Sequence, residues 1–472
     1  MAGFVGRRRE LEVLGSALAR VQEPSDPSRP GQCVLLRGRR RIGKSRLVEE
    51  FLRTAQAPYL FFTASGAPAE EELAQWPIAA EESTLPDRDL LLEEPPTGWG
   101  TALRALAQAL PDDRPSVVVI DEVPYLMAAV DGFEGILQRD WDRLLSRKPV
   151  LLLLIGSDLS MMEALNSYRR PFHQRGREMV VGPLNPAEVG RMLDLGPAEA
   201  VDAALISGGL PLVCLEWPAG QDTWGYLEQA LRDPLSALLV SAERSLAAEF
   251  PDQAMARQVL RAIGSGERTF TNIARAAGGI AHTTLSRALE VLMEKRVVAG
   301  ELPLSTRPSK ERRYRVADSY LRFWLRFLGP HLPEIERTRG DLVLHRIRRQ
   351  WTSWRGRAVE PLVREALARL LPLGELPAVP VIGGYWTRGN EVEIDLVGAD
   401  REPVARELLF LGSVKWLENA PFDGHDLAAL HKHRAALTDR PVPLLAVSRS
   451  GVTVTGLAAT LGPADLLTAW HA

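Results

Sequence analysis

One short run near the start of the chain constrains its fold more than any other segment. The run reads Gly38-Arg39-Arg40-Arg41-Ile42-Gly43-Lys44-Ser45. The apolar stretch 33–36 before it predicts a buried strand, and residues 46–52 after it predict an amphipathic helix. A glycine loop between strand and helix lets backbone N–H groups close around phosphates at the positive end of the helix dipole. The run therefore predicts an α/β domain with a parallel sheet and a nucleoside triphosphate site.

Two side chains of this loop have distinct expected roles. We expect Lys44 to reach the β- and γ-phosphates and the Ser45 hydroxyl to bind Mg²⁺. The chain has only six lysines, because arginine supplies most of its positive charge. A lysine retained at position 44 indicates that a compact ammonium is needed there.

A second buried strand, predicted at 117–120, ends in Asp121 and Glu122. Ligands bind at the carboxyl ends of strands in open parallel sheets. Asp121 is therefore expected to support the Mg²⁺ shell and Glu122 to polarise the attacking water. The implied cofactors are ATP and Mg²⁺, with Ser45 and Asp121 as the metal-binding pair. The predicted nucleotide-binding residues are Gly38, Arg41, Ile42, Gly43, Lys44, Ser45, Arg46 and Asp121.

Two further segments leave alternatives open. A third predicted strand, 151–156, ends at Ser157 and Asp158, where a polar side chain either senses the γ-phosphate or caps the next helix. The basic segment 168–177 is either a surface loop or the source of an arginine that stabilises charge in phosphoryl transfer. Such an arginine acts within one chain or, in a homo-oligomer, across a subunit boundary.

Composition places the chain among ordinary globular proteins. A length of 472 residues predicts two to four domains, and no apolar run is long enough to span a membrane. The N-terminus lacks the apolar core of a signal peptide, and two cysteines are too few for a disulfide framework or a zinc site. We expect a cytoplasmic protein with no membrane partner. Residues 21–31 and 64–98, rich in proline or acids and without periodicity, are expected to be surface excursions.

A different pattern follows in the middle of the chain. Predicted helices at 270–277 and 282–292 have helix-turn-helix spacing, and predicted strands at 297–301 and 312–316 flank a basic tip. This order predicts a winged helix-turn-helix. Its candidate contacts to double-stranded DNA are Thr283, Thr284 and Arg287 on the second helix and Lys310, Arg312 and Arg313 at the wing. The alternative is a module that docks a protein partner.

The motifs together resemble the archaeal-type ATPase family, within the AAA+/STAND-like P-loop NTPases. The matching segments are Phe4–Leu11, Gly38–Ser45, Ile120–Leu126, Gly156–Met162 and Gly208–Pro211. The family also has a Pro-Leu-Tyr-Gly-Arg-like motif, and here Pro171–Arg175 lacks its tyrosine and glycine. The resemblance implies an ATP hydrolase whose catalytic residues are Lys44, Glu122 and, at the arginine position of that motif, Arg175.

The last 130 or so residues predict a helix, three strands, a helix and a strand. This order resembles the PD-(D/E)xK, restriction-endonuclease-like fold that ends many archaeal-type ATPases. Such nucleases need two acids to hold Mg²⁺ and a lysine to activate water. The candidates are Glu360, Glu393, Asp395 and Lys415. The acid expected two residues before Lys415 is Ser413, which favours a nuclease-like fold with weak or no cleavage.

The sequence thus predicts a multidomain α/β protein. It comprises a P-loop ATPase core (1–185), a helical lid (186–250), a winged helix (251–330) and a nuclease-like domain (345–472). The favoured function is an ATPase that couples Mg-ATP hydrolysis to DNA binding. One alternative is a slow signalling switch that uses the winged helix and tail for protein partners, and another is an ATP-gated DNA endonuclease.

Overall fold

The computed structural model describes residues 4–168, 170–250 and 253–470, except for the side chains of residues 160, 248 and 249. The chain divides into two compact units, residues 1–183 and residues 184–472. The first unit ends close to the predicted boundary at 185. The second unit contains all three segments predicted at 186–250, 251–330 and 345–472. Arg169 of the basic segment, and residues 251 and 252 at the start of the predicted winged helix, lie outside the described residues.

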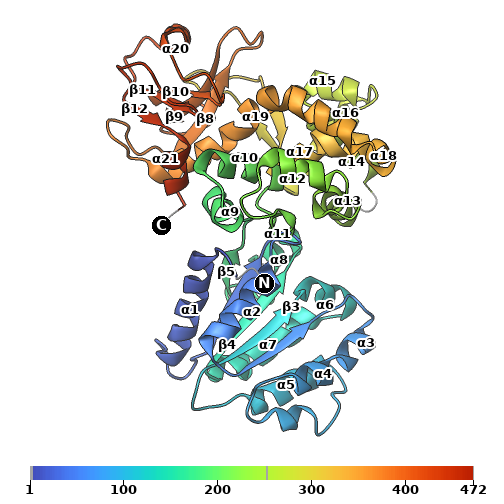
Figure 1. Cartoon of the computed structure of the whole chain (residues 1–472). Helices are drawn as coiled ribbons and strands as arrows, with labels where there is room; N and C mark the ends of the chain where they lie inside the picture. Colours follow the sequence, from blue (N-terminus) through green and yellow to red (C-terminus); the bar gives the residue numbers. More distant parts are fainter. Residues whose placement is uncertain (1–3, 169, 251–252, 471–472) are drawn as a thin grey trace. The chain divides into compact units, whose positions relative to one another are not determined.

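A five-stranded parallel sheet forms the centre of the first unit, with the strand order β2-β3-β4-β1-β5 (Figure 1). Strands β3 and β4 are buried at every position, as expected for a parallel sheet that helices cover on both faces. The strands are β1 (Gln32–Arg37), β2 (Tyr59–Thr63), β3 (Ser116–Asp121), β4 (Val150–Gly156) and β5 (Arg177–Val180).

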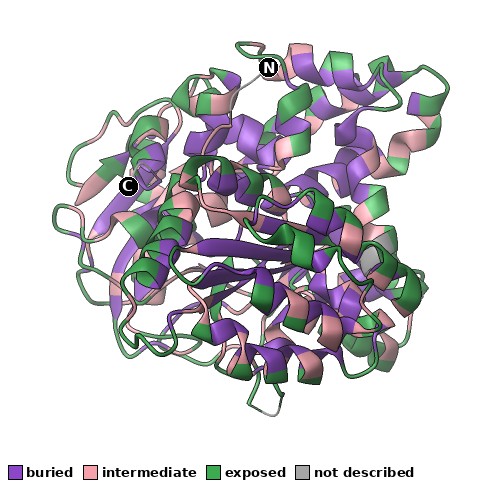
Figure 2. Ribbon diagram, turned by 90° about the horizontal axis from the view of Figure 1, so that it is seen from below, coloured by how far each residue is buried: buried purple, intermediate pink, exposed green. Residues whose placement is uncertain are grey.

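Amphipathic helices connect these strands. The helix after the glycine loop, α2, buries Leu47, Val48 and Phe51, and its charged residues Arg46, Glu49 and Arg53 are exposed. Figure 2 shows this burial pattern: strands are buried, and many helices are buried on one side and exposed on the other. The helices of this unit are α1 (Arg8–Gln22), α2 (Lys44–Ala55), α3 (Ala69–Ala74), α4 (Trp76–Glu81), α5 (Trp99–Ala109), α6 (Val123–Ala129), α7 (Phe133–Arg143) and α8 (Leu159–Leu165).

The segment 64–98 is more ordered than its sequence indicated. It contains α3, α4 and a short 3₁₀ turn, Arg88–Leu91. Trp76 is only 1% exposed, and its ring centroid lies 5.6 Å from that of Phe62 and 5.7 Å from that of Trp99. The expected surface excursion is therefore attached to the domain core by a buried tryptophan. Helices of six residues are too short to show a 3.6-residue period.

The second unit begins with five helices. The first, α9, starts at a capping box in which the Asn185 side chain accepts from the Glu188 backbone N–H (2.9 Å) and Glu188 accepts from the Asn185 N–H (2.9 Å). The helices are α9 (Pro186–Leu193), α10 (Pro197–Ser207), α11 (Pro211–Glu216), α12 (Thr223–Ala230) and α13 (Ala237–Glu249).

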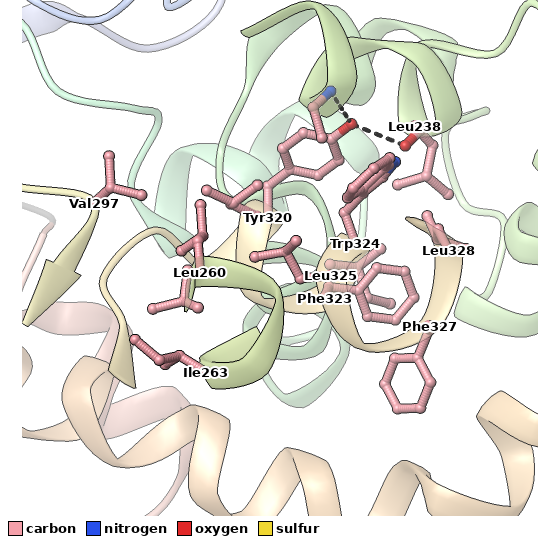
Figure 3. Close-up of a cluster of buried hydrophobic side chains, with 14 of the residues drawn as sticks. Leu238, Leu260, Ile263, Val297, Tyr320, Phe323, Trp324, Leu325, Phe327 and Leu328 are labelled. Carbon is pink, nitrogen blue, oxygen red and sulfur yellow. Dashed lines mark hydrogen bonds between the residues drawn. The ribbon is translucent and has the colours of Figure 1, made fainter. Parts of the chain in front are cut away.

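Three helices and a two-stranded antiparallel pair come next. They are α14 (Ala254–Gly264), α15 (Phe270–Ala276), α16 (His282–Glu294), β6 (Val298–Glu301) and β7 (Arg313–Val316). After β7, α17 (Ser319–Phe323) runs into a π-helical turn, Trp324–Leu328. The Tyr320 hydroxyl accepts from the Ala242 N–H (3.0 Å) and donates to the Leu238 carbonyl (2.9 Å), which joins α17 to α13 (Figure 3).

A mixed five-stranded sheet forms the C-terminal part, with the order β12-β11-β10-β9-β8. Strands β8, β9 and β10 pair antiparallel, whereas β10, β11 and β12 pair parallel. The elements are α18 (Leu332–Glu336), α19 (Gly340–Leu370), β8 (Val381–Trp386), β9 (Glu393–Ala399), β10 (Leu408–Lys415), α20 (Gly424–Leu437), β11 (Leu444–Ser448), β12 (Ala459–Leu461) and α21 (Pro463–Thr468).

A buried ion-pair network connects α10, α19 and the C-terminal sheet within the second unit. Asp202 of α10 accepts from Arg355 of α19 (2.7 Å), and from Arg449 (3.0 Å) and the Trp416 indole (3.3 Å) beside the C-terminal sheet. The helix α19 itself is 31 residues long and richly charged. Neither it nor any other helix of the described chain has the length and apolar content needed to cross a bilayer.

Candidate functional site

The loop between β1 and α2 has the curled backbone that a phosphate-binding loop needs. Arg41 and Gly43 both adopt the left-handed conformation, with φ of 65° and 83°. At Gly38, a Cβ atom would lie 2.4 Å from the Val181 carbonyl oxygen, so only glycine fits. Successive backbone N–H groups in such a turn form an anion-binding concavity at the start of α2.

Lys44 is the first residue of α2 and is buried in the loop. Its Nζ donates to the carbonyl oxygens of Gly38 (2.9 Å) and Arg39 (3.1 Å). Burial lowers the pKa of the Lys44 ammonium, and the carboxylates of Glu122 and Asp121 oppose this shift. The loop carbonyls thus hold the ammonium where a phosphate would bind.

Ser45 and Asp121 meet directly across the end of the sheet. The Ser45 hydroxyl donates to Asp121 Oδ2 at 2.6 Å, although the two residues are 76 positions apart in the chain. Burial raises the pKa of the Asp121 carboxyl, and the hydrogen bond from Ser45 opposes this shift. A hydroxyl and a carboxylate are hard oxygen donors, and Mg²⁺ takes only one or two protein ligands beside phosphate and water. The pair therefore fits the Mg²⁺ role that the sequence predicted.

Glu122 is held in place by two local features. It lies before α6 in the left-handed conformation, with φ of 55°, and its Oε2 accepts from the Ser157 hydroxyl at 2.8 Å. The neighbouring Asp158 side chain accepts from the Met161 backbone N–H (2.9 Å) and caps α8. Of the two roles left open for this strand end, Asp158 takes the capping role, and Ser157 contacts the Glu122 carboxylate.

Sequence reasoning missed one further contact in this region. Arg7 is 3% exposed, has φ of 62°, and donates from Nη2 to the Ile42 carbonyl oxygen at 2.8 Å. It also pairs with Glu10 (3.0 Å). The charge run at 7–9 gave no sign of this burial. Arg46, which was predicted to bind nucleotide, is exposed and pairs weakly with Glu49 (3.3 Å).

In the structure, Arg175 joins its own loop to α7. Its guanidinium is bidentate on the Asp142 carboxylate of α7, with Nε–Oδ1 2.9 Å and Nη2–Oδ2 2.8 Å. Its Nη1 donates to the carbonyls of Pro171 and His173 (2.9 Å each). Arg175 thus binds α7 through Nε and Nη2 and its own loop through Nη1, and its catalytic role stays a prediction.

The predicted DNA contacts fall into an exposed group and a buried residue. On α16, Thr283 and Arg287 are exposed and Thr284 is half-buried, and between β6 and β7 both Lys310 and Arg312 are exposed. Arg313 is 8% exposed.

Arg313 is buried because the β6–β7 connection packs on the C-terminal sheet. Its guanidinium pairs with Glu393 and Asn390 and lies over the Trp386 ring, with Cζ 4.4 Å from the centroid. The Trp386 indole also donates to the Glu311 carbonyl (2.8 Å). Arg313 is a packing residue rather than a DNA contact, and this corrects the prediction at that position.

The four predicted nuclease-like residues point to different partners. Asp395 Oδ2 accepts from the Ser413 hydroxyl (3.0 Å) and the Val414 N–H (2.8 Å). Lys415 Nζ pairs with Asp426 Oδ2 at 2.5 Å, and Glu393 pairs with Arg313. Within the described part of the chain, no three His, Cys, Asp or Glu side chains are grouped so as to hold a metal ion.

An arginine that the sequence did not reveal occupies the middle of this region. Arg364, one turn after Glu360 on α19, donates to the Asp395 carbonyl oxygen (2.9 and 3.1 Å) and to Glu360 Oε2 (3.4 Å). It also pairs with Glu301 of β6 (3.1 Å). Burial and, to a smaller extent, the neighbouring Asp395 raise the pKa of Glu360 to about 7, although Arg364 opposes the shift. The cation beside these acids is therefore a guanidinium of the chain itself.

Comparison with known proteins gives one family match and one relative. A family model described as "Archaea bacterial proteins of unknown function" (DUF234) matches residues 324–426. An uncharacterized protein of Methanocaldococcus jannaschii is 25% identical over 422 residues, which cover 88% of this chain and 87% of that protein.

Several solved structures have distant similarity in fold. A Walker-type ATPase of Pyrococcus abyssi is 18% identical and covers 68% of this chain and 96% of its own, with a TM-score of 0.48. The ORC2 protein of Aeropyrum pernix, in ADPNP-ADP complexes, is 13% identical over 72% of this chain and 94% of its own (TM-score 0.46). The ORC1 protein of the same organism, in complex with DNA, is 16% identical over 70% and 95% (TM-score 0.33). These similarities are too distant to assign a function.

Proposed function

We propose that the chain is a P-loop ATPase that binds and hydrolyses Mg-ATP and couples this reaction to binding of double-stranded DNA. The observation that carries the proposal is the meeting of Lys44, Ser45, Asp121 and Glu122 at the carboxyl edge of one parallel sheet. Parallel α/β sheets bind their ligands at this edge. Few other reactions use a glycine loop that ends in a lysine and a hydroxyl residue together with two acids at the end of another strand.

Each residue has a defined task in the proposed reaction. Lys44 exchanges the carbonyls of Gly38 and Arg39 for phosphate oxygens, so that its buried ammonium gains a negatively charged partner. Ser45 and Asp121 would hold Mg²⁺, and the bound ion would supply positive charge that offsets the charge on the phosphates. Glu122 accepts a hydrogen bond from the attacking water and orients it in line with the γ-phosphate.

The DNA part of the proposal rests on the order of elements after residue 253. The helices α15 and α16, followed by the antiparallel pair β6–β7, have the order of a winged helix-turn-helix. Thr283 and Arg287 are exposed on the second helix, and Lys310 and Arg312 are exposed in the wing. Cationic side chains at a wing contact phosphates and fix the register of the helix in the groove.

The nucleotide half of the proposal is tested by ATP binding and turnover of the full chain. Lys44→Ala should abolish tight ATP binding, because it removes the one cation buried in the loop. Lys148→Ala is the matched control, since Lys148 pairs with Asp112 at a solvent-accessible position. If Lys44→Ala bound and hydrolysed ATP like the wild type, the P-loop assignment would be wrong.

A slow signalling switch that docks proteins through the same module is the second candidate. It is favoured by the burial of Arg313, because part of the wing serves as a packing surface. Salt distinguishes the two functions, since phosphate contacts release counterions and make DNA affinity fall steeply with salt. An affinity for duplex DNA that is weak, or indifferent to salt, would favour the switch.

For the C-terminal sheet domain we propose a nuclease-like scaffold without cleavage. Ser413 occupies the position of the second acid and binds Asp395, while Lys415 is engaged by Asp426. We therefore expect no nicking of supercoiled DNA with Mg²⁺ or Mn²⁺. Metal-dependent nicking that disappears in Asp395→Ala would instead establish the ATP-gated endonuclease.

A further inference from the structure

The strand β2 leaves one side of its backbone open. It stands at an edge of the first sheet, and β3 is its one strand neighbour within the described chain. The Val117 N–H donates to the Pro58 carbonyl (2.9 Å), and the Ala64 N–H donates to the Asp121 carbonyl (3.0 Å). Backbone groups alternate sides along a strand. Residues 58, 60, 62 and 64 therefore face β3, and residues 59, 61 and 63 face outward.

The chain itself pairs only the first of these outward positions. The Tyr59 carbonyl accepts from the Thr84 N–H (2.9 Å), and the Tyr59 N–H donates to the Thr84 hydroxyl (2.8 Å). For the outward N–H and C=O groups of Phe61 and Thr63, the described residues provide no hydrogen-bond partner. The strand Tyr-Leu-Phe-Phe-Thr also lacks the proline or charge that usually protects an edge.

A groove of about 840 Å³ runs beside this open edge. Its walls are formed by residues of α2, α3 and α4, together with Tyr59 and Phe61 of β2. Ile78 of α4 also lines the groove and is 49% exposed, although it is a large apolar residue. The groove thus combines a free strand edge with apolar surface, as the sites that bind peptides by strand addition do.

The charge of the groove is predominantly negative. Glu49, Glu71 and Glu82 line it, all of them exposed. The one basic lining residue is Arg53, and Glu50 already binds its guanidinium through both oxygens (2.7 and 2.9 Å). An occupant that carries positive charge would therefore meet a complementary surface.

We propose that this groove, the β2 groove, binds an extended basic segment of a partner protein, which adds to the sheet as a strand beside β2. Its backbone pairs with the outward groups of Phe61 and Thr63. Its side chains point alternately to the apolar surface around Phe61 and Ile78 and to the carboxylates of the walls. This proposal concerns the acid-rich segment 64–98, which the ATPase reaction does not use, and it is independent of the proposed function.

Backbone pairing has a signature that simple charge attraction lacks. The probe is a fluorescein-labelled Val-Lys-Val-Lys-Val-Lys-Val peptide amide, titrated with the full chain and followed by fluorescence anisotropy. Two further peptides carry N-methyl groups, one on the lysine nitrogens and one on the inner valine nitrogens. Only one of the two sets of N–H groups faces β2, so one methylated peptide should bind like the parent and the other about tenfold more weakly. No binding by the parent, or equal affinities of the two methylated peptides, would overturn the proposal.

A charge-matched pair of variants tests the walls of the groove. Glu49→Gln, Glu71→Gln and Glu82→Gln together should weaken binding of the parent peptide about tenfold at low salt. Glu70→Gln, Glu81→Gln and Glu93→Gln make the same charge change at exposed positions outside the groove and should leave the affinity unchanged. An equal loss in both variants, or a protein that self-associates through β2 and excludes the peptide, would contradict binding of a basic partner here.

Discussion

Both the backbone and the carboxylate of Glu122, the proposed water-orienting residue, are held in place by the fold. Its left-handed backbone (φ 55°) is a conformation that residues other than glycine adopt at some cost, and such positions gather at functional sites. The hydrogen bond from Ser157 then fixes the carboxylate at the end of the sheet. The backbone and a neighbouring strand thus set the position of Glu122 before any nucleotide binds.

Glu122→Gln therefore separates ATP binding from hydrolysis. The amide keeps the length of the side chain and can still accept from Ser157, but it cannot take a proton from water. We expect turnover to fall at least about a hundredfold while ATP affinity stays within about twofold of the wild type. Steady-state turnover and nucleotide binding measure the two effects. Glu12→Gln, at an exposed position on α1, is the control, and retained turnover in Glu122→Gln would reject the role.

Glu360 makes stability depend on pH. Its pKa in the folded state is about 7, above its ordinary value of 4.5, so the folded chain binds the proton more tightly than the unfolded chain. The stabilisation from this proton is complete below about pH 4.5 and is lost as the pH rises through 7. We therefore compare the free energy of unfolding of Glu360→Gln with that of the wild type at each pH. The difference should favour the variant more at pH 8 than at pH 5, by up to about 3 kcal/mol. Thermal unfolding of both proteins at the two pH values measures the difference, and a constant difference would contradict it.

Among the short elements, the turn before α3 depends on one buried acid. Glu72 Oε1 accepts from the backbone N–H groups of Ser65 (2.8 Å), Gly66 (2.6 Å) and Ala67 (2.9 Å). Glu72→Ala should lower the free energy of unfolding by about 2–3 kcal/mol, because it leaves several donors without a partner. The exposed Glu70→Ala should change it by less than about 0.5 kcal/mol. Urea unfolding measures both, and equal effects would refute the role of Glu72.

Two neighbouring arginines at the start of β7 have opposite predicted roles. Arg313 is buried against Glu393 and Trp386, whereas Arg312 is exposed. Arg313→Ala should destabilise the chain by about 2 kcal/mol, because it leaves Glu393 without its main partner. Arg312→Ala should leave stability unchanged and weaken duplex DNA binding. The salt dependence of that binding should fall by the amount that corresponds to about one phosphate contact. Unfolding and DNA titrations on both variants test this, and reversed effects would contradict it.

At this scale, motifs of consecutive residues could be predicted from the sequence, whereas contacts between residues far apart in the chain could not. The P-loop and the Asp121-Glu122 strand end depend on consecutive residues, so their positions follow directly from the sequence. The contacts between Ser157 and Glu122, Arg313 and Glu393, and Arg364 and Asp395 join distant segments. A charged residue in sequence does not indicate which partner it will meet after folding. Arg175 shows the same limit, since its partner Asp142 lies 33 residues away.

At the scale of the whole molecule, the proposed nucleotide site and the proposed DNA surface belong to different units. Lys44, Ser45 and Glu122 lie in residues 1–183, whereas Arg287 and Arg312 lie in residues 184–472. Coupling between them means that binding of one ligand changes the affinity of the other site for its own ligand. For binding, this change is the same in both directions. The ATPase reaction alone does not require it. Coupling is therefore the claim on which the proposed function most depends.

The most direct measurement is ATP turnover of the full chain with increasing duplex DNA at low salt. The account predicts that DNA raises turnover in the wild type and produces no turnover in Lys44→Ala. It also predicts that a variant carrying Arg287→Ala and Arg312→Ala needs more DNA to reach the same rate. Slow turnover that is indifferent to DNA at every concentration would contradict the account and favour the signalling switch.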